Sequence, residues 1–270
     1  MSDVKQKTDV LITVMTYPHP SKGYKELICT AGITRNGDWV RLYPIDYRYR
    51  PKKQQFRKYQ WISVDLSVRG KGNDKRKESR EPVLDTIEVL EPPISTDNSW
   101  AERRKLIDTL PHHSVKEYKD QYDKDETSLG IVRPSRIIDM VFEETDRHWK
   151  PEWEASLAQI PLFGEQQKPL KKLPYKFSYI FECHDSTTPH KTMCEDWELG
   201  VLFFKEVDRL GSEEKAAESV RNKFFNEICS AQKDTSFFMG TIFPYNTWVV
   251  LGVFYPPKID PLDPVQLSLF

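Results

Sequence analysis

Cysteine and long apolar runs are scarce in this sequence, and each shortage excludes a class of protein. The 270 residues include four cysteines, which are too few and too scattered for the disulfide framework of a secreted domain. No segment approaches the roughly eighteen consecutive apolar residues of a membrane span, and no apolar run follows the first residues as it would in a signal peptide. We therefore expect a cytoplasmic protein that does not enter a membrane.

Catalytic signatures are also missing. The sequence has no G-x-S-x-G, no H-E-x-x-H and no deaminase motif, and its glycines lack the spacing of a P-loop or a dinucleotide-binding turn. Asp196 and Glu198 could serve a metal-dependent nuclease, although a helix N-cap is the more ordinary role for such a residue. The sequence therefore identifies no catalytic residue, and it favours a non-catalytic protein over an enzyme.

Charge, by contrast, is abundant and unevenly distributed. Residues 35–80 hold fourteen Lys or Arg and five Asp or Glu, an excess of nine positive charges, whereas the remainder carries a net charge of −10. Such asymmetry indicates a local surface for a polyanion. Aromatic residues such as Tyr47 and Tyr49 are interspersed with these cations, a mixture in which cations neutralise phosphates and aromatic faces stack bases.

Two basic loops are therefore candidate contacts with nucleic acid, and we expect that nucleic acid to be single-stranded DNA. The alternative is that these cations only solvate the surface, and for Trp39 and Trp61 we favour a place in the core. The candidate nucleic-acid-binding residues are Arg48, Arg50, Lys52, Lys53, Arg57, Lys58, Arg69, Lys71, Lys75 and Arg76.

Short β-branched segments separated by turn residues predict a mainly β fold of the α+β class. Asn36-Gly37 marks a tight hairpin, because both residues tolerate a positive φ. Strands are expected at residues 9–17, 27–33, 39–43, 59–68, 83–90, 175–183, 235–243 and 247–255, with an extended stretch at 129–144. Helices are expected at 99–110, from 114 onward, at 196–210 and at 212–229, with an irregular linker at 151–174.

Five strands joined by long polar loops in the first ninety or so residues suit a small barrel better than a βαβ unit. We expect residues 1–92 to form a first barrel and residues 93–127 a helical connector. Residues 128–256 would form a second β domain with two helices. The prolines of residues 257–270 predict an extended tail.

Several strings resemble a bacterial family described as containing a dual oligonucleotide-binding (OB)-like domain. They are Cys29 to Ile33, Gly37 to Pro44, Asp196-Trp197-Glu198 and Phe237 to Thr241, and the resemblance covers about residues 8 to 256. It implies two OB-like barrels in one chain, with helices inserted in or around the second. It implies little about activity, because a fold does not fix a function.

The C-terminal pentapeptide QLSLF resembles the motif with which bacterial replication and repair proteins bind the sliding clamp of DNA polymerase III. The resemblance implies that Leu269 and Phe270 fill a hydrophobic pocket of the clamp while Gln266 hydrogen-bonds at its rim, a mode in which side-chain pockets capture an extended peptide. The alternative is that the apolar terminus packs on its own domain. The candidate clamp-binding residues are Gln266, Leu267, Ser268, Leu269 and Phe270.

A Cys/His-rich segment, residues 183–194, is a candidate metal site. Cysteine and histidine are ligands of zinc, and cysteine thiolates also hold iron-sulfur clusters. Cys183, Cys194 and His190 are the candidate ligands, although their spacing matches no standard zinc motif and Cys29 or Cys229 could complete the set. The alternative is that these cysteines are ordinary buried thiols.

Together these features favour a DNA-associated, OB-like module that the C-terminal peptide recruits to the sliding clamp, in replication, repair or defence against mobile DNA. One alternative is a clamp-tethered nuclease, or a repair enzyme with a zinc or iron-sulfur site. The other is a clamp-binding inhibitor or adaptor.

Overall fold

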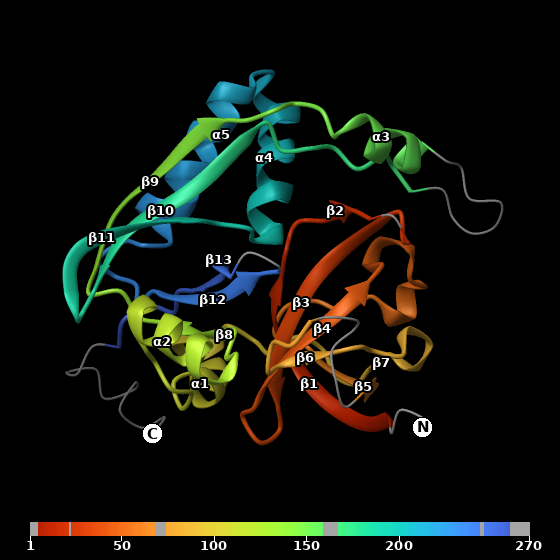
Figure 1. Cartoon of the computed structure of the whole chain (residues 1–270). Helices are drawn as coiled ribbons and strands as arrows, with labels where there is room; N and C mark the ends of the chain where they lie inside the picture. The colour runs from red at the N-terminus through yellow and green to blue at the C-terminus, as the bar shows by residue number, and fades with distance from the viewer. Residues whose placement is uncertain (1–4, 22, 68–73, 159–166, 244–245, 260–270) are drawn as a thin grey trace.

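The fold is mainly β, and its α-helices all follow the first sheet in the chain (Figure 1). The computed structural model describes residues 5–21, 23–67, 74–158, 167–243 and 246–259. Within these residues, none of the helices combines the length and the apolar character needed to cross a membrane.

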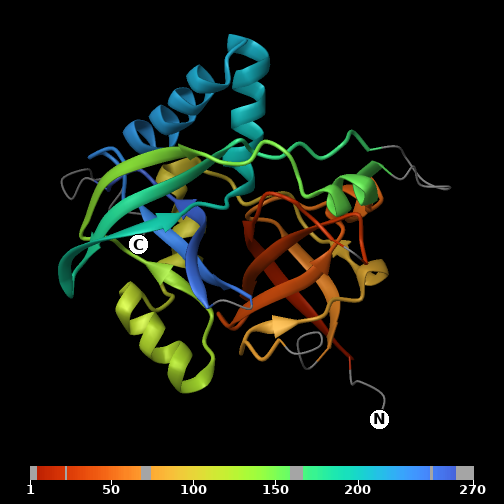
Figure 2. The same cartoon turned by 45° about the horizontal axis from the view of Figure 1, so that its top comes forward.

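The first half of the chain, from β1 to β7 (residues 5–89), forms a strongly curved seven-stranded sheet. Its strand order is β6-β4-β3-β1-β5-β7, with β2 paired to β3 (Figures 1 and 2). Its central strand β1 is apolar on both faces, because Val10 and Ile12 enter one cluster of buried residues while Leu11 and Val14 enter another. The strands are β1 (Lys5–Met15), β2 (His19–Pro20), β3 (Glu26–Thr34), β4 (Trp39–Ile45), β5 (Trp61–Ser67), β6 (Ser79–Arg80) and β7 (Glu88–Val89).

Two helices, α1 (Asp97–Ile107) and α2 (Val115–Asp125), lead into the second half. A capping box starts α2, since the Ser114 side chain accepts a hydrogen bond from the backbone N–H of Glu117 and the Glu117 carboxylate accepts one from that of Ser114.

The second half of the chain, from β8 to β13 (residues 129–254), contains two three-stranded sheets, β11-β10-β9 and β13-β12-β8. Figure 1 shows the first as an arch beside α4 and α5, and Phe203 of α4 packs on Phe177 of β10 with ring centroids 6.3 Å apart. The elements are β8 (Leu129–Val132), β9 (Arg136–Glu144), α3 (Pro151–Ala158), β10 (Tyr175–Cys183), β11 (Ser186–Met193), α4 (Trp197–Leu210), α5 (Glu213–Arg221), β12 (Ser236–Ile242) and β13 (Thr247–Phe254), with a π-helical turn at Asn222–Glu227.

Isolated bridges link the open edges of these sheets. In the first half, Leu66 of β5 bridges Pro82, which follows β6. In the second half, Cys194, which follows β11, forms a parallel bridge with Val250 of β13. Among the described residues, the strands that pair through continuous hydrogen bonding do not close into barrels. In each half, only a single bridge spans the gap between the edges that would meet in a closed barrel.

The two halves share a hydrophobic core. One cluster of buried residues joins Leu11 and Ile33 of the first sheet to Ile107 of α1, Leu129 of β8 and Phe238 of β12. Segment 194–196 also crosses between the halves, because Asp196 bridges Thr16 and the Tyr17 N–H donates to the carbonyl of Glu195 at 3.0 Å. The halves therefore pack as one body.

The predicted α+β, mainly β class is confirmed, and the hairpin at Gly37 is present with a φ of 84°. The two small barrels expected from the sequence are not closed by continuous strand pairing. The longer elements that the prediction missed are β11, in the segment read as Cys/His-rich, and α3, at the start of the segment read as an irregular linker, and the two-residue strands β2 and β6 were also missed. Trp61 is buried and Trp39 packs against the same cluster, as expected for core residues.

Candidate nucleic-acid interface

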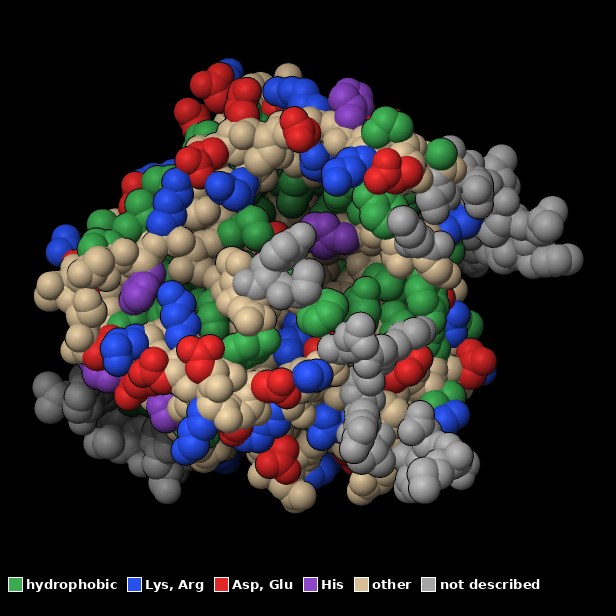
Figure 3. Space-filling view, viewed as in Figure 1, with side chains coloured by type: hydrophobic (Ala, Val, Ile, Leu, Met, Phe, Trp, Pro, Cys, Tyr) green, Lys and Arg blue, Asp and Glu red, His purple; other side chains and the backbone are tan. Residues whose placement is uncertain are grey.

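A cleft of about 560 Å³ lies between one face of β3 and β4 and the strands β11, β12 and β13 of the second half. Strand β4 supplies its floor through alternation, since Val40 and Leu42 point into a buried cluster whereas Arg41 and Tyr43 line the cleft. Figure 3 shows this face of the molecule hollowed between the two halves, with hydrophobic side chains on the walls. The cleft is thus built by both halves.

Arg41 is the most deeply buried cation of the cleft, at 1% exposure. Its Nη2 donates to the carbonyl of Ser128 at 2.9 Å and to its Oγ at 3.2 Å, while Nη1 lies 3.2 Å from Cys29 Sγ. Its Nε has no hydrogen-bond partner in the described residues. Burial lowers the pKa of Arg41, and the nearby positive charge of Arg76 lowers it further. The cleft therefore brings two guanidinium groups close together.

Arg76 lies at the edge of the cleft and is held by two elements. Its Nε and Nη2 donate to the two carboxylate oxygens of Asp74 at 2.8 and 2.7 Å, and its Nη1 donates to the carbonyl of Thr241 at 2.8 Å. Burial acts to lower the pKa of Arg76, but the hydrogen bond and charge of Asp74 outweigh it and raise the pKa. The guanidinium is therefore fixed in place and charged.

Two aromatic rings at the cleft are unusually exposed. Tyr43 is 40% exposed and Phe243, directly after β12, is 49% exposed. The Arg76 guanidinium lies 5.7 Å from the centroid of the Phe243 ring, within the range of a cation–π contact. Exposed rings beside cations are suited to stacking a planar ligand, because aromatic faces gain from covering apolar surface.

His19 and Glu195 form a polar pair at one end of the cleft, with His19 Nε2 at 3.1 Å from a Glu195 carboxylate oxygen. Desolvation acts to lower the pKa of His19, but the hydrogen bond and negative charge of Glu195 raise it above its usual value. Asp74 and Glu195 match the two guanidinium charges of Arg41 and Arg76, so the cleft combines both signs with exposed aromatic surface.

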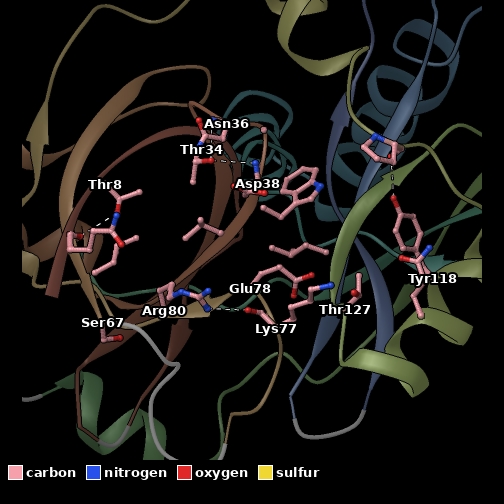
Figure 4. A pocket seen from close by; sticks show the side chains of 18 of the residues that line it. Thr8, Thr34, Asn36, Asp38, Ser67, Lys77, Glu78, Arg80, Tyr118 and Thr127 are labelled. Atoms are coloured by element: carbon pink, nitrogen blue, oxygen red, sulfur yellow. Dashed lines mark hydrogen bonds between the residues drawn. The ribbon is translucent and has the colours of Figure 1, made fainter. Parts of the chain in front are cut away.

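A second cavity of about 660 Å³ lies on another side of the first sheet, beside the Gly37 hairpin, β6 and α2 (Figure 4). The two aromatic side chains that line it are engaged elsewhere: Tyr118 is buried and stacked on Trp248 at 5.3 Å, and Trp39 meets Phe238 edge-on at 6.0 Å. Its polar groups are partly paired with one another, as where Arg80 donates to the carbonyl of Lys77 at 2.9 Å. This cavity offers no exposed ring, so we place the candidate interface at the first cleft.

The predicted cations fall into two groups. Several are held in ion pairs: Arg48 with Glu26 at 3.0 Å, Arg50 with Asp46 at 2.7 Å and with Asp85 at 3.1 Å, Lys58 with Asp196 at 2.7 Å, and Arg76 with Asp74 at 2.7 Å. The exposed ones are Lys52, Lys53, Arg57 and Lys75. Arg69 and Lys71 lie outside the described residues. The structure therefore uses about half of the described candidates in ion pairs and leaves the others open to a polyanion.

The three candidate metal ligands are not brought together. Cys183 lies at one end of β10, opposite Ser186, whereas Cys194 lies beside Phe177 toward the other end, since its N–H donates to the Phe177 carbonyl. Six residues of extended strand separate the two positions by about 20 Å. Within the described residues, no three His, Cys, Asp or Glu side chains form a group that could hold a metal ion.

The candidate clamp-binding residues 266–270 lie outside the described residues. Asp196, considered above as a nuclease ligand or an N-cap, caps α4 by accepting a hydrogen bond from the Glu198 N–H at 2.8 Å. Sequence reasoning missed Arg41 and Phe243 as cleft residues. The alternation of residues 39–43 could have shown that Arg41 and Tyr43 lie on the same face of one strand. Nothing in the sequence indicates that Phe243 lines the same cleft as these two residues.

Comparisons with known proteins give two family matches. Residues 111–270 match a family described as a domain of unknown function (DUF8757), and residues 6–109 match another domain of unknown function (DUF8758). No curated protein matches the chain. Among solved structures, the chain is similar to a murine DNA-binding protein bound to double-stranded DNA, with a TM-score of 0.28 and 10% identity over 96% of this chain and 99% of that one. Similarity at that TM-score carries no argument about this chain.

Proposed function

This chain belongs to the DUF8757 family, whose match spans more than half of it, and we propose that it binds single-stranded nucleic acid in the cleft between its halves. The observation that carries the proposal is the pair of exposed rings, Tyr43 and Phe243, beside Arg41 and Arg76. Proteins that hold single strands combine cations along the backbone with rings on which bases stack. The exposed cations Lys52 and Lys53 would add a salt-dependent attraction.

The strand order of both halves supports this proposal and the proposed relation to the dual OB-like family. In the first half the order is β1-β3-β4-β6, and Pro82, two residues after the end of β6, bridges Leu66 of β5. In the second half the order is β9-β10-β11, followed through the Cys194 bridge by β13, β12 and β8. Each half thus resembles a partly open Greek-key barrel, a type that binds oligonucleotides on its second and third strands. In the first half, β3 and β4 are the strands that correspond to this second and third strand, and they form the floor of the cleft.

We further propose that the C-terminal QLSLF peptide brings this module to the sliding clamp of bacterial DNA polymerase III. The sequence match and the prolines before it support the proposal. A tethered module acts at a high effective concentration, so a modest intrinsic affinity for nucleic acid would suffice.

The test of nucleic-acid binding is the fluorescence anisotropy of a labelled single-stranded oligonucleotide. Removing one stacking ring is worth about 1–3 kcal/mol, so Tyr43→Ala and Phe243→Ala should each weaken binding by about 5- to 150-fold. Val201→Ala is the matched control, because Val201 of α4 is an apolar side chain of similar exposure, 47%, that does not line the cleft. Equal affinities for all three variants and the wild type would place the binding surface elsewhere, and no binding by the wild type would refute the proposal.

The clamp proposal has a separate test. Protein lacking residues 266–270 should fail to bind purified clamp in a pull-down while retaining its oligonucleotide affinity and its melting temperature. Clamp binding by the truncated protein would refute the proposed role of the tail, and a lowered melting temperature would show instead that the tail packs on its own domain.

A further inference from the structure

A smaller side pocket, of about 200 Å³, adjoins the cleft. His19, Met193 and Glu195 line both cavities, so the side pocket lies directly beyond the polar pair at the end of the cleft. Cys194 and Asp196, which the sequence analysis considered as metal ligands, also line the pocket.

The walls of this side pocket are largely aromatic. Tyr17 and Trp149 line it, together with Tyr175 and Phe177 of β10. Trp149 is half-buried, and its indole N–H donates to the carbonyl of Leu170 at 3.2 Å. These residues lie on three different segments of the chain and line one small space.

The ring of Trp149 is held in position by polar neighbours. Lys172 Nζ lies 5.7 Å from its ring centroid and donates to the carbonyl of His148 at 3.1 Å. The His19 ring meets Trp149 edge-on at 6.0 Å. On the opposite wall, the Tyr17 hydroxyl donates to the carbonyl of Lys171 at 2.9 Å. The pocket is therefore fixed by the contacts of residues 148–149 and 170–172 with one another and with Tyr17 and His19.

We propose that this side pocket receives one unstacked base of the nucleic acid bound in the cleft. The inference rests on the function proposed above. A volume of about 200 Å³ lies below the range typical for drug-sized ligands, which suits a single base better than a larger group. Aromatic walls recover the stacking that a base loses when it leaves its neighbours.

The pocket mouth carries groups that can read the edge of a base. Glu195 offers carboxylate oxygens as acceptors, and His19 offers a ring nitrogen that donates when protonated. Because this pair lies where the two cavities meet, a base entering from the cleft passes it, and its polar edge can exchange hydrogen bonds with either side chain.

The experiment uses the full-length protein and a single-stranded oligonucleotide carrying 5-iodouracil at one position in turn, cross-linked by light and mapped by mass spectrometry. Cross-links are expected at Trp149 or Tyr17. The matched variants are Trp149→Ala and Trp153→Ala, because Trp153 lies on the neighbouring helix α3, is also half-buried and does not line the pocket. Trp149→Ala should weaken binding by about fivefold or more, whereas Trp153→Ala should leave it unchanged.

The outcomes separate the two proposals. An oligonucleotide that binds and cross-links only outside the pocket would overturn the side-pocket proposal and leave the cleft proposal standing. Wild-type protein that shows no anisotropy change with the oligonucleotide would overturn both. Because the cross-link is mapped on the wild-type protein, the result does not depend on whether a variant folds.

Discussion

Replacing Lys58 by Met should destabilise the whole protein, because Lys58 neutralises a buried carboxylate where the halves meet. Its ammonium lies 2.7 Å from both carboxylate oxygens of Asp196 and 3.4 Å from Glu198. The side chains of Lys58 and Asp196 are only 9% and 2% exposed. Burial acts to lower the pKa of Lys58, but the charges of Asp196 and Glu198 outweigh it and raise the pKa, so the cation persists at neutral pH.

The expected loss of stability follows from the interactions that Asp196 retains in the Lys58→Met variant. Without the lysine, the carboxylate retains the hydrogen bond from the Glu198 N–H at 2.8 Å but has no cation to compensate its charge. Breaking one partner of a buried ion pair costs about 3–5 kcal/mol. For a chain of this size, each kcal/mol lowers the melting temperature by about 2–4 °C, so Lys58→Met should lower it by about 6–20 °C.

The assay is thermal unfolding followed by circular dichroism, with Lys7→Met as the control. Lys7 pairs with Glu88 at 3.7 Å, but both side chains are more than 60% exposed, and exposed pairs contribute below about 1 kcal/mol. The double variant Lys58→Met/Asp196→Asn should recover part of the loss, because the amide oxygen can still cap α4 without a charge. If Lys58→Met loses no more than Lys7→Met, the account of this pair as a joint between the halves is wrong.

Three further predictions concern stability and reactivity. Burial raises the pKa of Glu26 to about 7, so the folded state binds its proton more tightly than the unfolded state; stability should fall as pH rises from about 4.5 to 7, and Glu26→Gln should abolish that fall in urea titrations across this range. Gly130→Ala should cost about 1–3 kcal/mol because the new Cβ would lie 2.0 Å from the Tyr118 ring, whereas Gly23→Ala, with nothing within 4 Å, should unfold at the wild-type midpoint. Burial raises the pKa of Cys194 well above its usual value, so alkylation mapped by mass spectrometry should modify this thiol only after the protein unfolds. Alkylation of Cys194 in the folded protein as fast as that of an exposed thiol would contradict its burial.

Local signals predicted the elements whose residues carry strong patterns. The Gly37 hairpin follows from its turn residues, and Ser114 shows the spacing of a capping box that the structure contains. Strand β11 gave no such signal, because Ser186–Met193 is polar, largely exposed and contains Pro189. Such a composition is tolerated at the edge of a sheet, where one row of backbone groups needs no partner.

Helix α3 had a signal that could have been used. Pro151 stands at its first position and Glu152 and Glu154 lie in its first turn, as expected near a helix N-terminus. By contrast, the partners of the cations could not be read from the sequence. Arg41 contacts Ser128, eighty-seven residues away, and Lys58 contacts Asp196, one hundred and thirty-eight residues away. Long-range pairing decides which cations stay exposed, and a basic stretch alone does not encode it.

The shared core has a consequence for how such genes can change. The two family matches meet near residue 110, yet Ile33 and Ile107 on one side of that boundary share a buried cluster with Leu129 and Phe238 on the other. A recombination event that exchanged only one half would place unmatched apolar surfaces against each other. We therefore expect the two regions to be inherited as a unit and to diverge together, with substitutions on one side of the boundary compensated on the other.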